Sequence, residues 1–172
     1  MHYIRSVTFI QTVAALAFIA LLSGCYTAQK NIPTPPPPSA KELQLRQEIV
    51  RYAQNLRGSN YKYAGTTPRT GFDCSGFTSY VLKQFSVPVS TSSAAQAKEG
   101  REIPLKAIQP GDLIIFGKNR NNIQHVAMVV ETNRQGIFVV HSTTSRGVIQ
   151  ENISTSSYWE PLILLARDVI SK

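Results

Sequence analysis

The segment GDLIIFGKNRNNIQHVAMVVETNRQGIFVVHS, residues 111–142, decides the fold class because it breaks into short apolar runs separated by polar and turn residues. The runs are rich in Val and Ile, which is typical of β-strands. Together with the sequence that follows, this pattern predicts strands over Leu113–Phe116, His125–Glu131, Ile137–Ser142, Val148–Asn152 and Leu162–Ile170.

The half of the chain before this segment carries a helical pattern. Ser39, followed three residues later by Glu42, is a capping-box signature for a helix start. A stripe at helical spacing then runs as far as Gly58: Leu43, Arg46, Ile49, Val50, Ala53 and Leu56. Further helices are predicted over Cys74–Phe85 and Ser93–Glu99. Helices gathered before an antiparallel sheet favour an α+β fold.

Length and composition indicate one folded domain without a nucleic-acid-binding surface. The chain has 172 residues, 42% of them hydrophobic and 16% charged, which excludes a largely disordered protein. The net charge of +8 would suit polyanions in general, but we find no clustered basic stripe or nucleic-acid motif. Two cysteines cannot form a disulfide framework. No apolar run after residue 25 approaches the length of a membrane-spanning helix.

The first residues have the pattern of an export signal. Arg5 precedes the apolar stretch 7–22, and small residues precede Cys25. The block Leu21-Leu22-Ser23-Gly24-Cys25 resembles the bacterial lipobox, so we predict a signal peptide over 1–24 and lipidation of Cys25. An ordinary signal peptide with an incidental Cys is the alternative. Because Tyr26 rather than Asp follows the Cys, we expect an outer-membrane anchor facing the periplasm.

Residues 25–38 are predicted to be a tether between the lipid and the folded domain. Five prolines occur here, at positions 33 and 35–38, and such a segment favours extended polyproline II. At roughly 3.1 Å per residue the tether would reach on the order of 40 Å at most. The folded domain is expected to span 39–172.

Cys74 is the candidate nucleophile. If Cys25 is lipidated, Cys74 is the remaining thiol of an exported chain. It opens the second predicted helix, where unpaired backbone N–H groups and the helix dipole favour thiolate. The charge of Asp73 opposes this effect, although its side chain could cap the helix instead. A buried, inert Cys is the alternative.

Two histidines are candidate bases, since His2 would leave with the signal peptide. His125 and His141 lie on consecutive predicted strands, and a turn with its apex at Asn133 would place them opposite each other on one face. Opposed Cβ atoms lie about 4.5–5.5 Å apart, so one imidazole could orient the other. We predict a base and its orienting partner; a metal pair or two core histidines are the alternatives.

Several motifs, taken together, resemble the NlpC-type cysteine peptidases, which are papain-like bacterial cell-wall hydrolases. In chain order they are Tyr61–Gly65, Gly71–Phe77, Pro110–Leu113, His125–Met128 and Val139–Ser142. The likeness covers about residues 43–170, and Ser157-Tyr158-Trp159 adds a likeness to the lipoprotein branch that includes the murein endopeptidase Spr. The resemblance implies a papain-like fold with N-terminal helices packed on a five- to six-stranded antiparallel sheet.

The resemblance also assigns roles to residues of this chain. It implies that Cys74 is the nucleophile, His125 the general base and acid, and His141 the orienting third member. Tyr61 would lie beside the nucleophile near the oxyanion site, or be a packed aromatic. Ser75 either contacts substrate or only occupies the first helical turn.

The sequence departs from the family pattern without losing a catalytic group. Ala64 stands where a second Gly is usual, Val89 where an Arg commonly follows the Pro, and Ala127 where a Gly usually follows His-Val. The Val89 departure bears on contacts in the substrate groove. Asp112, after Pro-Gly at a strand start, is expected to make turn hydrogen bonds rather than serve as a triad acid.

The implied function is hydrolysis of amide bonds in peptidoglycan stem peptides or their crosslinks through a thiolate acyl-enzyme. The resemblance implies no metal and no cofactor, and we expect a monomer whose partners are stem peptides and, through Cys25, a membrane. The alternatives are an N-acetylmuramoyl-L-alanine amidase or acyltransferase on the same fold, or a catalytically silent murein-binding lipoprotein.

Overall fold

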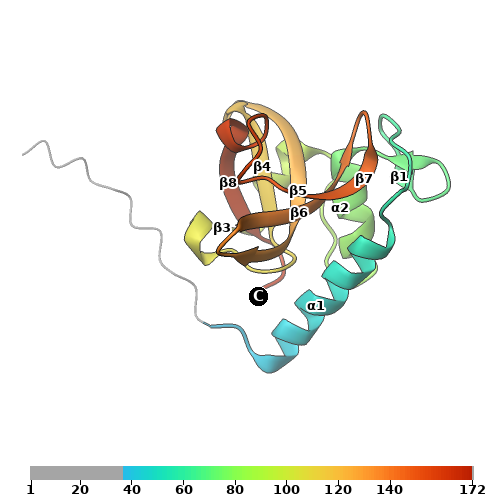
Figure 1. Ribbon diagram of the computed structural model, residues 1–172. Helices are drawn as coiled ribbons and strands as arrows, with labels where there is room; N and C mark the ends of the chain where they lie inside the picture. The colour runs from blue at the N-terminus through green and yellow to red at the C-terminus, as the bar shows by residue number, and fades with distance from the viewer. Residues whose placement is uncertain (1–36, 172) are drawn as a thin grey trace, which may run out of the picture. The chain divides into compact units, whose positions relative to one another are not determined.

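Residues 37–171 are described by the computed structural model, and their elements follow the expected order, helices first and a sheet second (Figure 1). The predicted signal peptide, the lipidation site at Cys25 and residues 26–36 of the predicted tether lie outside the described residues. Among the residues described, no helix is both long and apolar enough to cross a membrane. The helices are α1 Ala40–Asn55, α2 Cys74–Lys83 and α3 Ser93–Gln96, with 3-10 turns at Leu105–Ala107 and Glu160–Leu162.

A six-stranded antiparallel sheet forms the larger part of the fold, which confirms the predicted α+β class. Its strand order is β3-β8-β4-β5-β6-β7. The bounds are β3 Arg101–Ile103, β4 Leu113–Asn119, β5 Asn122–Asn133, β6 Gly136–Thr143, β7 Gly147–Asn152 and β8 Ile163–Asp168. The sequence did not predict the edge strand β3, nor the two-residue strands β1 Thr66–Thr67 and β2 Gly71–Phe72 that pair with each other.

The sheet is buried on both faces. On one face α1 and α2 pack against β-strand residues that include Val126, Met128 and Val140. On the other face Ala127, Val129 and other alternate residues pack under the C-terminal segment that contains Trp159. This double burial explains why β4 and the centre of β5 read as continuous apolar runs rather than as alternating ones.

The register predicted for the β5–β6 hairpin is wrong by two residues. Asn133 pairs with Gly136 rather than forming the apex, and a bulge at Val130 precedes the pairing of Val129 with Val139. Continuing this register places His141 beside Ala127 instead of His125. Because side chains alternate with a period of two, a shift by two residues keeps both histidines on one face. They are therefore diagonal neighbours.

The start of α1 uses half of the predicted capping box. Ser39 Oγ accepts a hydrogen bond from Glu42 N at 3.2 Å, as expected for an N-cap. The Glu42 carboxylate does not return to the cap and instead accepts from Arg46 Nε at 2.9 Å and from Ser171 Oγ at 2.6 Å. The ion pair of Glu42 with Arg46 thus takes the place of the expected hydrogen bond from the Ser39 backbone N–H to Glu42.

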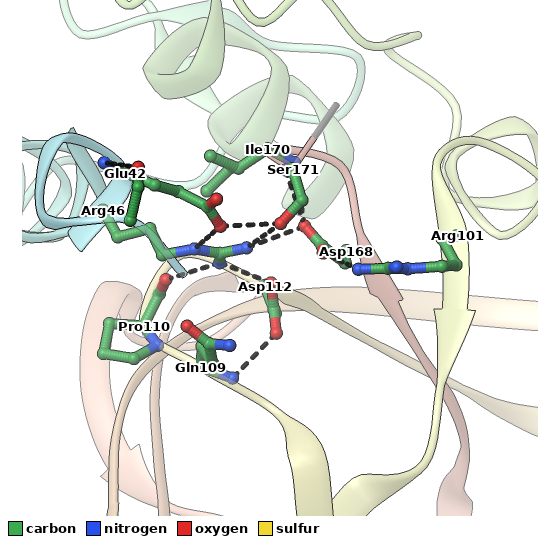
Figure 2. Close-up of polar contacts among 10 residues, drawn as sticks. Glu42, Arg46, Arg101, Gln109, Pro110, Asp112, Asp168, Ile170 and Ser171 are labelled. Atoms are coloured by element: carbon green, nitrogen blue, oxygen red, sulfur yellow. Dashed lines mark hydrogen bonds and ion pairs between the residues drawn. The ribbon is translucent and has the colours of Figure 1, made fainter. Parts of the chain in front are cut away.

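Arg46 lies at the centre of a buried ion network (Figure 2). Its Nη1 contacts Asp112 Oδ1 at 2.7 Å, and its Nη2 contacts Asp168 Oδ1 at 2.8 Å. Pro110 O and Ser171 Oγ accept the remaining hydrogen bonds. The side chain is only 1% exposed, so α1, the turn before β4 and the end of β8 are joined away from water.

The two carboxylates respond differently to this environment. Burial raises the pKa of Asp112 to about 6, against the opposing effect of Arg46. For Asp168 the hydrogen bonds from Ser171 and the charge of Arg46 outweigh burial and lower the pKa to about 2. Asp112 also accepts from Gln109 N at 2.7 Å, so its predicted role in the turn is confirmed.

We expect Arg46→Met to lower the free energy of unfolding by about 3–5 kcal/mol, because it leaves Asp112 and Asp168 buried without their cation. Urea unfolding followed by circular dichroism measures this loss. Arg51→Met, at an exposed position of the same helix, is the matched control and should change stability by less than about 0.5 kcal/mol. A loss no larger than that of the control would show that the network does not hold α1 in place.

Candidate active site

The N-terminus of α2 is built to hold Cys74 at the surface of the core. Asp73 caps the helix, since its Oδ1 accepts from Gly76 N at 2.6 Å, which confirms the capping role considered for it. Gly76 lies so close to the carbonyl of Gly65 that a Cβ there would collide with it. The helix start is therefore pressed against the 61–65 loop, and only glycine fits at the contact.

Cys74, His125 and Tyr61 line one cavity of about 520 Å³. Cys74 enters it from α2 and His125 from β5, whereas Tyr61 comes from the loop that pairs with Phe72. Burial raises the pKa of Tyr61, and Cys74 is the next contributor to that shift, which is consistent with the two side chains being neighbours. The fold thus brings together residues separated by up to 64 positions in the chain, as the difference between 125 and 61 gives.

The two histidines are hydrogen-bonded to each other. His125 Nε2 and His141 Nδ1 are 2.9 Å apart, and both side chains are buried. His141 Nε2 in turn lies 2.8 Å from Glu151 Oε1. Both nitrogens of His141 are therefore engaged, while Nδ1 of His125 is the ring nitrogen left for the cavity that contains Cys74.

Trp159 covers this polar chain. Its indole stacks on the His125 ring with centroids 4.5 Å apart and an interplanar angle of 27°. Its Nε1 donates to Glu151 Oε1 at 2.9 Å. Phe116 packs against both the indole and His125, so the three rings form one aromatic cluster.

The sequence and the fold both match known proteins. A family model described as the NlpC/P60 family matches residues 58–168. The chain belongs to the NlpC/P60 family.

Individual relatives agree with this assignment. A Bacillus subtilis protein named gamma-DL-glutamyl hydrolase is 36% identical over 124 residues, which cover 70% of this chain and 29% of that protein. The Escherichia coli K12 protein named murein DD-endopeptidase MepS/murein LD-carboxypeptidase is 27% identical over 133 residues, covering 77% of this chain and 67% of that one. A crystal structure of an NlpC/P60 family protein from Bacillus cereus superposes with a TM-score of 0.66 at 26% identity, covering 81% of this chain and 42% of that one. The chain thus spans less than a third of the Bacillus subtilis relative.

Ser75, unlike Cys74, His125 and Tyr61, does not line the cavity of this NlpC/P60 domain. Its hydroxyl donates to Thr91 O at 2.7 Å and lies 3.2 Å from Asp73 Oδ1, and the side chain is buried. Within the residues that the structure describes, Ser75 is not part of the lining around Cys74. Of the two roles considered for it, the structure supports the helix-turn role.

The departures from the family pattern are accommodated in different ways. Ala64 takes a φ of 54°, a left-handed conformation that costs a non-glycine residue roughly 1–2 kcal/mol and explains why a Gly is usual there. Val89 packs against the core, and its carbonyl accepts from Ser79 Oγ at 2.8 Å. Ala127 is fully buried beside His141.

Sequence reasoning did not single out Glu151, Arg146 or the contacts of Trp159. Glu151 lies on β7, two residues beyond Ile149, which pairs with His141. The two-residue spacing puts Glu151 and His141 on one face of the sheet. The sequence could have indicated this contact through the charged residue on the next strand, but only if the β6–β7 register had been known.

Burial disfavours the charged forms of Cys74 and of both histidines. It raises the pKa of the Cys74 thiol, against the opposing effect of the Val126 amide. It lowers the pKa of His125 well below the usual value, with His141 as the second cause, and lowers that of His141 as well. The sequence predicted that the helix N-terminus would favour the thiolate of Cys74, but burial outweighs this effect and raises the pKa.

We expect the free energy of unfolding to contain a histidine contribution that falls as the pH drops below about 6.5, the ordinary histidine pKa. The unfolded chain binds protons there that folded His125 and His141 resist, so acid favours unfolding. Urea unfolding between pH 5 and 8, compared between wild type and His125→Asn, isolates this contribution. The comparison is needed because Asp112, with its raised pKa, gives the opposite slope in both proteins. Identical pH dependence in the two proteins would contradict the prediction.

Proposed function

We propose that this NlpC/P60 domain is a cysteine endopeptidase that hydrolyses amide bonds in peptidoglycan. The observation that carries the proposal is one cavity lined by Cys74 at a helix N-terminus and by His125, whose Nε2 is hydrogen-bonded to His141. A thiol, a base and a group that orients the base are the parts required for acyl transfer.

The reaction begins when His125 Nδ1 takes the proton of the Cys74 thiol. The sulfur attacks the scissile carbonyl, and the developing oxyanion is stabilised by backbone N–H groups at the start of α2. The imidazolium then gives its proton to the leaving amine as the C–N bond breaks and the acyl-enzyme forms. A water molecule, deprotonated by His125, attacks the acyl-enzyme and releases the carboxylate product and the thiol.

The substrate class follows from the family and from the charge of the chain. The two relatives described above are named for hydrolysis of γ-glutamyl bonds and of murein. Stem peptides carry free carboxylates, which suit a chain with a net charge of +8. Between the bond from D-glutamate to diaminopimelate and the crosslink from D-alanine to diaminopimelate, we propose the crosslink, on the likeness to the murein endopeptidase branch.

We expect wild-type protein to release soluble fragments from purified peptidoglycan and Cys74→Ala to release none above background, because the acyl-enzyme requires the sulfur. Mass spectrometry of the digest identifies the bond that is cut. Thr132→Ala, at an exposed position of β5, is the control and should match wild type.

Each class of product has its own mass, so the digest also decides between the alternatives. Monomers from crosslinked dimers support the proposed bond. Split stems indicate a γ-glutamyl endopeptidase, and intact peptides freed from the sugar indicate an amidase. Equal digestion by wild type and Cys74→Ala would contradict a cysteine mechanism of any kind.

We also propose that the domain is anchored through lipid on Cys25 and faces the periplasm from the outer membrane. The support is the lipobox-like block 21–25 with Tyr26 after it, and the five prolines at positions 33 and 35–38 that would space the domain from the bilayer. An anchored hydrolase would meet the murein layer from the membrane side.

Cys25→Ser should abolish acylation and either release the domain from the membrane or stall its processing, since the modified sulfur is removed. Intact-mass spectrometry and membrane fractionation of wild type and variant measure both effects. Thr27→Ser, two residues further on, is the control and should keep the lipid mass. A membrane-bound Cys25→Ser protein of unchanged lipid mass would rule out this anchor.

A further inference from the structure

Glu151 has a set of contacts that the reaction described above does not use. Its Oε1 lies 2.8 Å from His141 Nε2, and the same oxygen accepts from Trp159 Nε1 at 2.9 Å. Arg146 Nη2 contacts both carboxylate oxygens, at 2.9 and 3.0 Å. We propose that Glu151 is a positioning residue that fixes the tautomers of both histidines, so that His125 Nδ1 is left unprotonated toward Cys74. This role rests on the proposed function, because His125 is the base of that reaction and Glu151 sets its tautomer.

An ionised carboxylate such as that of Glu151 accepts hydrogen bonds and donates none. Hydrogen bonds from Arg146, His141 and Trp159 lower the pKa of Glu151 in spite of its partial burial, so it is ionised at neutral pH. The hydrogen of the Glu151–His141 contact must therefore lie on His141 Nε2. In a neutral ring the other nitrogen, Nδ1, then carries a lone pair and no hydrogen.

The tautomer of His141 in turn determines the tautomer of His125. Because His141 Nδ1 is an acceptor, the hydrogen of the 2.9 Å contact between the rings must lie on His125 Nε2. A neutral His125 then has a bare Nδ1. That nitrogen can accept the thiol proton of Cys74, as the reaction requires.

The opposite arrangement would disable the base. If His141 carried its hydrogen on Nδ1, it would donate to His125 Nε2, and neutral His125 would hold its own hydrogen on Nδ1. A ring protonated at Nδ1 can donate to sulfur but cannot take its proton. The ring nitrogen of His141 that carries the hydrogen therefore decides whether Cys74 can be activated.

Burial and Arg146 together keep the carboxylate from drawing a second proton onto His141. A charged carboxylate alone would favour the imidazolium form of its neighbour, in which both nitrogens donate. Burial lowers the pKa of His141, and the positive charge of Arg146 lowers it further, so together they offset this effect. Trp159 holds the same oxygen and stacks on His125, so the carboxylate and the base share one rigid support.

The tautomers are tested directly by long-range ¹H–¹⁵N correlation spectra of the histidine side chains in the full chain at neutral pH. The signals of His125 and His141 are assigned with His125→Asn and His141→Asn. We expect both histidine rings of the wild-type protein to be protonated at Nε2. In Glu151→Ala the Nδ1-protonated form should appear. Glu151→Gln should keep more of the wild-type form, because its amide oxygen still accepts a hydrogen bond. Glu131→Gln, at an exposed position of β5, is the matched control and should leave the spectra unchanged.

A kinetic readout separates positioning from a merely structural effect. The rate of iodoacetamide alkylation at Cys74, followed by peptide mass spectrometry, depends on base-assisted ionisation at neutral pH and on no substrate. We expect Glu151→Ala to slow alkylation roughly tenfold or more at pH 7, a part of the ~10²–10⁴-fold that a positioned base contributes. The gap should close only above the pKa of Cys74, which burial raises, because the thiolate forms there without help. On a cleavable muropeptide, kcat should fall while KM stays within about twofold.

These results are independent of the peptidoglycan digest. If wild type leaves peptidoglycan intact but shows the expected tautomers and alkylation pattern, the proposed substrate is wrong and the role of Glu151 stands. If wild-type His125 carries its proton on Nδ1, the role of Glu151 is overturned whatever the digest shows, even if Glu151→Ala fails to fold. A folded Glu151→Ala protein that is slowed equally at every pH would overturn it as well.

Discussion

The guanidinium of Arg46 joins α1 to the neighbouring strands β4 and β8, a connection that the hydrogen bonds of the sheet do not make. It contacts Asp112 in the turn before β4 and Asp168 at the end of β8, while its own backbone belongs to α1. Because each of these charges would be costly to bury alone, they are stable inside the protein only together. The network fixes α1 on the sheet, and Ile49 and Ala53 of that helix then complete the core that supports α2. The position of Cys74 depends on this arrangement.

A second buried polar network, around the active site, is organised on the opposite principle. The Arg46 network balances ions against ions, whereas Cys74, His125 and His141 are kept uncharged by burial. Charges appear only at its outer end, where Glu151 and the half-exposed Arg146 form an ion pair. Because the two histidine rings are neutral and hydrogen-bonded in series, the ion pair of Glu151 and Arg146 determines which ring nitrogens carry hydrogen.

The sequence predicted the fold class and most element positions because the information is local. Capping by Ser39 and Asp73, helical spacing before residue 85 and apolar runs after residue 112 each depend on neighbouring residues. The β5–β6 register was wrong because the bulge at Val130 and the turn position depend on packing across the sheet. The shared face of His125 and His141 survived the error only because the shift was an even number of residues.

Other parts of the site could not be read from one sequence. Glu151 reaches His141 through the pairing of β7 with β6, and Trp159 reaches His125 through a segment that crosses the sheet. Both contacts join residues whose proximity is decided by tertiary structure. The ionisation of Cys74 was misjudged for a related reason: the helix N-terminus is visible in the sequence, but the burial that outweighs it is not.

Burial of Cys74 bears on its chemistry, because it favours the thiol over the thiolate. Thiolate, rather than thiol, is the species that oxidants attack, so a permanently ionised cysteine would be exposed to damage in an oxidising compartment. Here burial keeps the sulfur protonated, and His125 supplies the acceptor in the same cavity. In the proposed reaction, a bound peptide would add a carbonyl whose developing charge the start of α2 stabilises, so that proton transfer becomes favourable along with bond formation. Substrate would thereby raise a reactivity that His125 already supports, and the tautomer of His125 determines whether the proton can be transferred.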